Sequence, residues 1–192
     1  MRRLTVLVLM LSTVFAVAAH ASGGNRPDPP PAATGGAPAP QGSSAALTTR
    51  QQAEQWYADA YDDIAKAKQD AADGKAKNSE KRFRRALDRA MRATEYDTTY
   101  HEAWNLAGFA ARKLGNYPKS LAAYRTSIRL NGGYAPAREY YGHALLESGD
   151  LKGAEEQLAW LQNSKATELA ASLQAAIDAK KGAKAAAEPA QH

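Results

Sequence analysis

The sequence predicts an all-α protein made of about three helical hairpins, the first of them elongated, followed by one capping helix. The first observation is a repeat, because Gly108 and Gly115 recur 34 residues later as Gly142 and Gly149. The second is composition: 44% of the 192 residues are hydrophobic, and Ala supplies much of that share, which suits helices packed through small residues. A period of this length with two apolar helical stretches is typical of arrays of two-helix units.

The first 21 residues have the order of a secretory signal peptide. Two Arg precede an apolar run from Leu4 to Ala19, and Ala19-His20-Ala21 has the small-x-small form of a cleavage site. A retained membrane anchor is the alternative, but the run is shorter than the roughly 20 apolar residues that span a bilayer. We expect cleavage after Ala21, no transmembrane segment thereafter, and an exported protein, periplasmic or secreted.

Residues 22–48 are rich in Pro, Gly and Ala and contain almost no large apolar side chain. Such a segment cannot bury enough surface to offset its ordering entropy, so we expect a disordered spacer. A proline-rich ligand for another domain is the alternative function. The last residues, 181–192, are also poor in large apolar side chains, and we expect a disordered tail there.

The helical domain is expected over residues 49–178, and its first unit, at about 50–100, is irregular. Ala65 and Ala86 occupy the places of Gly108 and Ser120 in the next unit, yet nine more residues separate them. We predict a hairpin with longer helices and a turn near Asp73-Gly74. The alternative is an ordinary hairpin with a long loop.

The second and third units are expected at 101–134 and 135–168, and their turns follow known helix-end chemistry. A small residue at 108 and at 142 allows the second helix of the same unit to approach closely. Glycine suits the left-handed position that ends a helix, Asn and Asp are good N-caps, and Pro is tolerated in a first turn. The residues that fit these roles are Gly115, Gly149, Asn116, Asp150, Pro118 and Pro136. After them, Leu169, Leu173 and Ile177 mark an amphipathic capping helix at about 164–180.

These positions resemble the tetratricopeptide repeat (TPR) family. The residues that carry the resemblance are Trp104, Gly108, Gly115, Tyr117 and Tyr124 in one unit and Gly142, Gly149, Ala154 and Leu161 in the next. The chain departs from the family at Thr98 and Gly132, where Pro is usual, and at Ser120, where Ala is usual. The resemblance implies a helical-hairpin solenoid that binds another protein or peptide in a concave groove.

Nothing in the sequence indicates an enzyme. There is no Cys, and the four His are scattered, two of them in different units as His101 and His143. A metal site shared by those two is a minor alternative. No nucleophile elbow and no phosphate-binding glycine loop is present. We therefore expect no catalytic residues, no cofactor and no bound metal.

The resemblance places a partner groove on the first helices of the units. Its residues are Glu102, Asn105, Phe109, Arg112, Lys113, Glu139, His143, Leu146 and Glu147, with Pro136 in the third unit and Asp62, Lys66 and Gln69 in the first. Phe109 is either an aromatic anchor for a partner or a packing residue between units. The charges are mixed, so we expect a partner with both signs of charge and not the carboxylate clamp of the family.

A second surface, the basic stripe, consists of Arg82, Arg85, Arg89 and Arg92 on one helix. It is either a solvated face with local ion pairs or a docking surface for anionic lipid or wall polymer. Removal of the first 21 residues would lower the net charge from +5 to +3, too weak to indicate nucleic-acid binding. The sequence thus predicts a protein-binding scaffold of the cell envelope, with an envelope-structural factor that docks through the stripe as the alternative.

Overall fold

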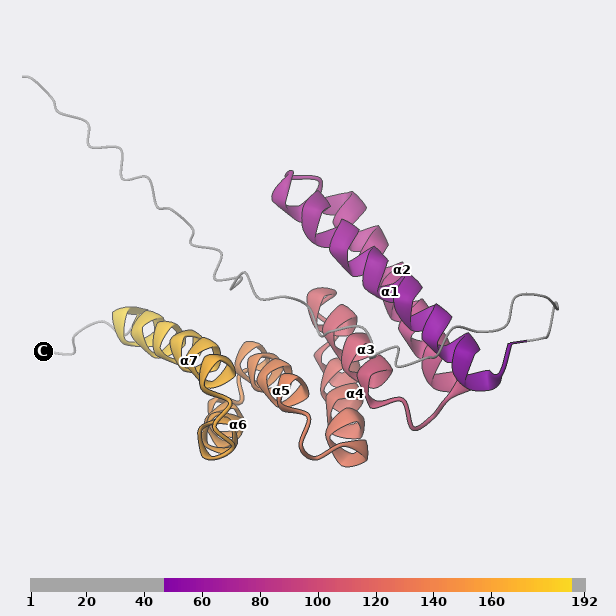
Figure 1. Cartoon of the computed structure of the whole chain (residues 1–192). Helices are drawn as coiled ribbons and strands as arrows, with labels where there is room; N and C mark the ends of the chain where they lie inside the picture. The colour runs from indigo at the N-terminus through magenta and orange to yellow at the C-terminus, as the bar shows by residue number, and fades with distance from the viewer. Residues whose placement is uncertain (1–46, 188–192) are drawn as a thin grey trace, which may run out of the picture.

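The computed structural model describes residues 47–187, and this part of the chain is entirely helical (Figure 1). The expected signal peptide, most of the expected spacer and the end of the tail lie outside these residues. Seven helices and no strand are found in the described range. The helices are α1 (Thr49–Ala72), α2 (Ala76–Tyr96), α3 (His101–Lys113), α4 (Tyr117–Leu130), α5 (Ala135–Ser148), α6 (Leu151–Asn163) and α7 (Thr167–Ala187).

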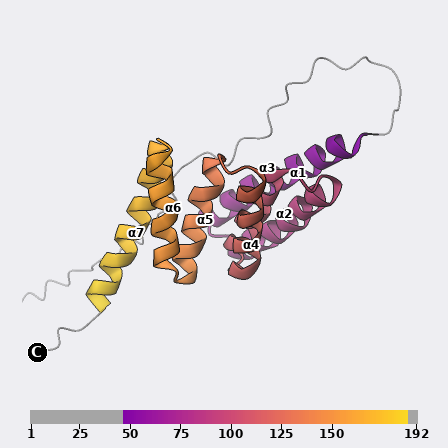
Figure 2. The ribbon, with the colours of Figure 1, turned by 90° about the horizontal axis from the view of Figure 1, so that it is seen from below.

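The helices pack in chain order, from the α1–α2 hairpin at one end to α6 and α7 at the other (Figure 2). Each helix contacts the next one, and α1, α3, α5 and α7 also contact one another in sequence. By contrast, no Cα atom of α4 comes within 8 Å of α2 or α6. The row α1, α3, α5 and α7 is therefore closely packed, and the row α2, α4 and α6 is more widely spaced. Because of this difference the array curves, with α1, α3, α5 and α7 on its inner side. We call this inner side the concave face.

The predicted turns are confirmed. Gly115 and Gly149 have φ values of +71° and +98°, the left-handed region that glycine adopts without strain. Asn116 then caps α4, its Oδ1 accepting from the Lys119 N–H at 3.2 Å. Asp150 caps α6 in the same way. These local signals fix where each hairpin reverses.

The elongated first hairpin is also confirmed, and the long-loop alternative is wrong. Helix α1 has 24 residues and α2 has 21, against 13 and 14 for α3 and α4. The turn contains Gly74 at φ +74°. Figure 1 shows the tip of this hairpin extending past the ends of α3 and α4. The overhang creates a surface that shorter hairpins would lack.

The glycines inside helices behave differently in the two shorter hairpins. A Cβ added at Gly108 would lie 2.7 Å from Cε1 of Tyr124, so α4 does approach α3 closely there, as predicted. At Gly142 the expected neighbour is wrong, because the added Cβ would meet Leu173 of α7 and not a residue of α6. The reason is that α7 packs directly on α5.

The last helix differs from expectation at its end. Leu173 and Ile177 are buried, at 0% and 1% exposure, which confirms α7 as a packed capping helix. It begins at Thr167 and continues to Ala187, so residues 181–187 are helical and not part of a disordered tail. None of the helices within residues 47–187 has both the length and the apolar character needed to cross a bilayer.

Candidate functional site

The structure divides the predicted groove residues into two groups. Five are buried: Asn105, Phe109, Arg112, Glu139 and Leu146. Four keep exposed or partly exposed side chains: Glu102, Lys113, His143 and Glu147. The residues expected from the first unit, Asp62, Lys66 and Gln69, are all exposed on α1. The residues predicted for the centre of the groove are therefore buried. The accessible part of the concave face is polar.

Phe109 belongs to the interior, which corrects its expected role as an accessible anchor. It is only 4% exposed, and its ring centroid lies 6.4 Å from that of Phe83 on α2 and 5.4 Å from that of Tyr140 on α5. The ring therefore fills the joint between three consecutive hairpins. The packing alternative describes it, because neighbouring aromatic rings already cover the faces a partner would need.

Arg112 is likewise committed to contacts inside the protein. Its Nη1 donates to Oε1 of Glu147 at 2.7 Å, linking α3 to α5. Its side chain is 7% exposed, while that of Glu147 is 42% exposed. The pair consequently offers a partner a carboxylate and not a guanidinium. Of the two basic groove residues predicted in the second unit, Lys113 alone is therefore accessible to a partner.

A polar cluster lies where α3 and α5 begin. The rings of His101 and Tyr134 are 4.8 Å apart, and Nε2 of His101 is 3.0 Å from Nδ2 of Asn131. Burial, and then the negative charge of Glu102, raise the pKa of Tyr134 well above its usual value. The phenol therefore stays protonated at every physiological pH. Asn105 is fully buried, and Glu102 lies at the rim of the cluster, its Oε2 3.3 Å from Nδ1 of His101.

His143 lies on the next part of the concave face. Its Nε2 is 3.8 Å from Oε1 of Glu139 and 3.4 Å from Oγ of Ser172. It is thus held between α5 and α7, far along the chain from His101. Within residues 47–187 no group of three His, Asp or Glu side chains is arranged to hold a metal ion.

Three of the four arginines of the basic stripe are bonded to carboxylates of α1, while Arg85 and Arg92 also keep exposed side chains. Arg85 Nε and Arg89 Nη1 both donate to Oδ2 of Asp63 at 2.7 Å, and Arg85 makes a second bond to Oδ1. Arg82 Nε donates to Oδ2 of Asp70 at 2.6 Å. The fourth arginine, Arg92, pairs with Glu95 on its own helix. Of the two predictions, the face with ion pairs is the one that matches this geometry.

Asp63 is the centre of these ion pairs, and sequence reasoning missed it. Its side chain is 1% exposed. Burial opposes its ionisation, but the hydrogen bond from Arg85 and the charges of Arg89 and Arg85 outweigh that, so its pKa lies below the usual value. The available signal was spacing: Asp63 and Asp70 are two helical turns apart and share one face of α1.

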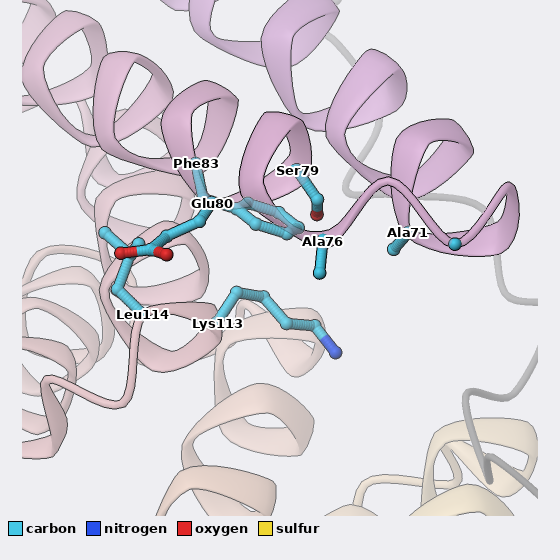
Figure 3. A pocket seen from close by; sticks show the side chains of 8 residues that line it. Ala71, Ala76, Ser79, Glu80, Phe83, Lys113 and Leu114 are labelled. Carbon is cyan, nitrogen blue, oxygen red and sulfur yellow. The ribbon is translucent and has the colours of Figure 1, made fainter.

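One hollow of about 380 Å³ opens where the overhanging tip of the first hairpin meets the end of α3 (Figure 3). We call it the tip hollow. Its lining residues are Ala71, Gly74, Ala76, Ser79, Glu80, Phe83, Lys113 and Leu114. Of these only Lys113 was among the predicted site residues. The extra length of the first hairpin was the signal that could have indicated a hollow here.

Comparison with known proteins adds no relative. No family model matches the chain, and no curated protein matches it. Its function must therefore be argued from the fold and from these surfaces.

Proposed function

We propose that this protein is a non-enzymatic scaffold of the tetratricopeptide type, which binds a protein or peptide segment on its concave face. The observation that carries the proposal is the curvature of the array. Its inner row of helices is in continuous contact and its outer row is not. Stacked two-helix units with this curvature create extended inner surfaces that suit a segment of another chain. The matching positions of Gly115 and Gly149, 34 residues apart, support the same class of fold.

The accessible residues of that face define the kind of partner. Lys113 on α3 offers a positive charge, while Glu102 on α3 and Glu147 on α5 offer negative ones. On α1 the exposed residues Asp62 and Lys66 add one charge of each sign. The partner segment is therefore expected to carry both signs of charge. Because the rings of Phe109 and Tyr140 are packed inside, polar contacts and not an anchor at Phe109 would set its affinity.

The expected cellular location enters this proposal as a second part. The order of charged, apolar and small residues in the first 21 positions supports export to the periplasm or beyond. The scaffold would then act on proteins of the cell envelope. Docking through the basic stripe has less support, since Arg82, Arg85 and Arg89 are engaged by carboxylates of α1.

The proposal is tested by site-specific photo-crosslinking in cells. A photoreactive residue is placed at Lys113 or at Glu147 on the concave face, and at Lys119 or Arg125, which are exposed on α4 of the outer row. We expect one and the same protein to be captured from both concave positions and from neither outer position. The affinity of the purified partner for the Lys113→Glu protein is then compared with its affinity for the Lys119→Glu protein. We expect the partner to bind the Lys113→Glu protein more weakly. Capture from the outer positions alone would overturn the concave face as the binding surface.

A further inference from the structure

Positive charge is distributed unevenly along the chain. Residues 103–138 contain six basic residues and no acidic one, whereas the net charge of the whole chain is only +5, so the rest of the chain is close to neutral. Of these six, Arg112 is buried and bonded to Glu147, and Lys113 lies on the concave face. The other four lie on α4 or near the beginning of α5: Lys119, Arg125, Arg129 and Arg138.

Three arginines in the described part of the chain have no carboxylate partner. Seven of the ten arginines within residues 47–187 form ion pairs. The other three are Arg125, Arg129 and Arg138, and we call them the outer arginine patch. Helix α4 carries no acidic residue that could pair with them. The patch therefore differs from the basic stripe, whose arginines are bonded to carboxylates of the protein itself.

The three arginines lie at the C-terminal end of α4. Arg125 and Arg129 are exposed and one helical turn apart, so they share a face of α4. Arg138 extends from α5, and its Nη2 is 3.5 Å from the carbonyl oxygen of Gly132, in the turn that directly follows α4. Figure 2 shows α5 between α4 and α6. The patch thus lies on α4 and on the part of α5 that meets α6.

Arg138 is held in place, yet its hydrogen-bonding groups are incompletely used. Its Nη1 donates to Oε1 of Gln157 at 3.2 Å, and its guanidinium carbon lies 4.2 Å from the centre of the Trp160 ring. Its Nε is buried without a hydrogen-bond partner. Burial lowers the pKa of Arg138, and no carboxylate offsets this effect. A guanidinium has five N–H groups and is well suited to a carboxylate, which it binds with two parallel hydrogen bonds.

The source of such a carboxylate follows from what surrounds the patch. The residues of the sequence outside 47–187 include two acidic ones, Asp28 and Glu188, which are too few to match three arginines. An anionic lipid surface fits less well. The exposed large apolar side chains of the described residues are Leu47 and Tyr96, both beside the first hairpin, so the patch has no apolar anchor next to it. Three charges alone hold a protein only weakly at a membrane.

We propose that the outer arginine patch binds an acidic segment of a second protein. One carboxylate of the segment is held by Arg138 in front of Trp160, and neighbouring carboxylates pair with Arg125 and Arg129. The patch is separate from the concave face, so the two surfaces can be occupied independently. This second protein would be crosslinked from Arg125 and not from Lys113, which distinguishes it from the partner expected on the concave face.

The test is a titration of the full chain, followed by ¹⁵N–¹H spectra, with a peptide of eight glutamates as the probe and a peptide of eight glutamines as the neutral control. We expect saturable shifts centred on the amides of Arg129, Gly132 and Arg138 and on the indole N–H of Trp160. The Kd should be about 0.1 mM in about 50 mM salt. Absence of saturable shifts up to about 5 mM, equal binding of the control, or shifts centred on the basic stripe would overturn the proposal.

Variants locate the interaction. Arg138→Gln should raise the Kd about tenfold, because the preorganised guanidinium is lost. The double variant Arg125→Gln, Arg129→Gln should raise it about fivefold, and it tests the patch independently of any change in the packing around Trp160. The matched control is Arg92→Gln, at an exposed arginine of the basic stripe, which should leave the Kd unchanged. An increase in Kd for Arg92→Gln equal to that of the double variant would contradict the assignment.

Two further measurements address the other possible occupants of the patch. Sedimentation of the chain alone should show a monomer. A dimer that Arg138→Gln dissociates would place a second copy on the patch and overturn the proposal. Vesicles with about one third phosphatidylglycerol should not retain the protein more than neutral vesicles do. Retention that the double variant abolishes would assign the patch to a lipid surface and overturn the proposal as well.

Discussion

The first hairpin and the α3–α4 hairpin hold their two helices together by different means. In α1–α2 buried alanines such as Ala60 and Ala90 let the helices approach, and the carboxylate of Asp63 binds two arginines across the pair. In α3–α4 the approach depends on Gly108 against the Tyr124 ring. There the cross-links are neutral, from serine hydroxyls to backbone carbonyls.

The difference follows from their surroundings. The α3–α4 hairpin has neighbours on both sides, so its contacts with α2 and α5 supplement its internal ones. Among the described helices, the first hairpin has a neighbour on one side only, and its tip extends beyond that neighbour. A helix pair in that position must supply its own cross-links, and charged hydrogen bonds are stronger than neutral ones. Five predictions test this comparison, and they follow in order of expected effect.

Phe109→Ala should give the largest effect, because this ring joins the two regions. Removal of a buried phenyl ring costs about 3–5 kcal/mol of unfolding free energy. Urea denaturation measures the loss, and Tyr96→Ala, at a residue that is 41% exposed, is the control with an expected change below about 0.5 kcal/mol. A loss under about 1 kcal/mol would mean that Phe109 is not a packing residue.

Asp63→Asn should destabilise the first hairpin by about 2 kcal/mol. Breaking a fully buried ion pair costs about 3–5 kcal/mol, but Arg85 and Arg89 are partly exposed and can be rehydrated. The matched control is Asp62→Asn, at the neighbouring exposed position, with an expected change within about 0.5 kcal/mol. Equal urea midpoints for the two variants would exclude the cross-link.

The same pair predicts a pH dependence. The pKa of Asp63 is lowered in the folded state, where arginine bonds outweigh the opposing effect of burial, relative to about 3.9 in the unfolded chain. Its stabilisation is therefore complete above the unfolded value and is lost as pH falls through the lower, folded value. The stability difference between wild type and Asp63→Asn should shrink in acid, as measured by urea titrations from pH 7 to about 2. A constant difference would contradict the shift.

Gly108→Ala should cost more than Gly142→Ala. At Gly108 the new methyl group meets the ring of Tyr124, which is fully buried and cannot move aside, so we expect a loss of about 1–2 kcal/mol. At Gly142 it meets the flexible end of the Leu173 side chain at 2.4 Å; Leu173 is also fully buried, but among the described helices α7 packs on α5 and α6 alone, so it can shift outward. Thermal unfolding of the two variants is the measurement. A reversed order would show that α4 is more mobile against α3 than the close contact implies.

Ser120→Ala should give the smallest effect, below about 1 kcal/mol. The variant loses the bond from Ser120 Oγ to the Gly108 carbonyl, but Ala is the better helix former. The same change at Ser127 serves as a second measurement. A loss comparable to that of Asp63→Asn would mean that neutral cross-links fasten a hairpin as firmly as charged ones.

The sequence was sufficient wherever a feature depends on near neighbours in the chain. The turn glycines at 74, 115 and 149, the caps at Asn116 and Asp150, and the extra length of the first hairpin are of this kind. Each is set by residues within one or two helical turns. The all-helical architecture of the described residues follows from them.

Features that depend on the distance between hairpins could not be predicted in this way. Whether Phe109 is an anchor or a packing residue depends on how far Phe83 and Tyr140 stand from it. Whether the arginines of the basic stripe are paired with α1 depends on the axial register of α1 against α2, which places Asp63 between Arg85 and Arg89. The neighbour of Gly142 was missed for the same reason, since it lies on a helix two elements further along.

The one-sided contact between helices has a mechanical consequence. Since the inner row is continuous while α4 keeps at least 8 Å between its Cα atoms and those of α2 and α6, the array is compliant in one direction only. Fanning the outer helices apart disrupts no close backbone approach between them, whereas pressing the inner row together compresses packed side chains, which resist compression. The array would therefore bend by opening its outer row while the inner row keeps its contacts. A partner that lies on the inner side could therefore adjust the curvature at low elastic cost.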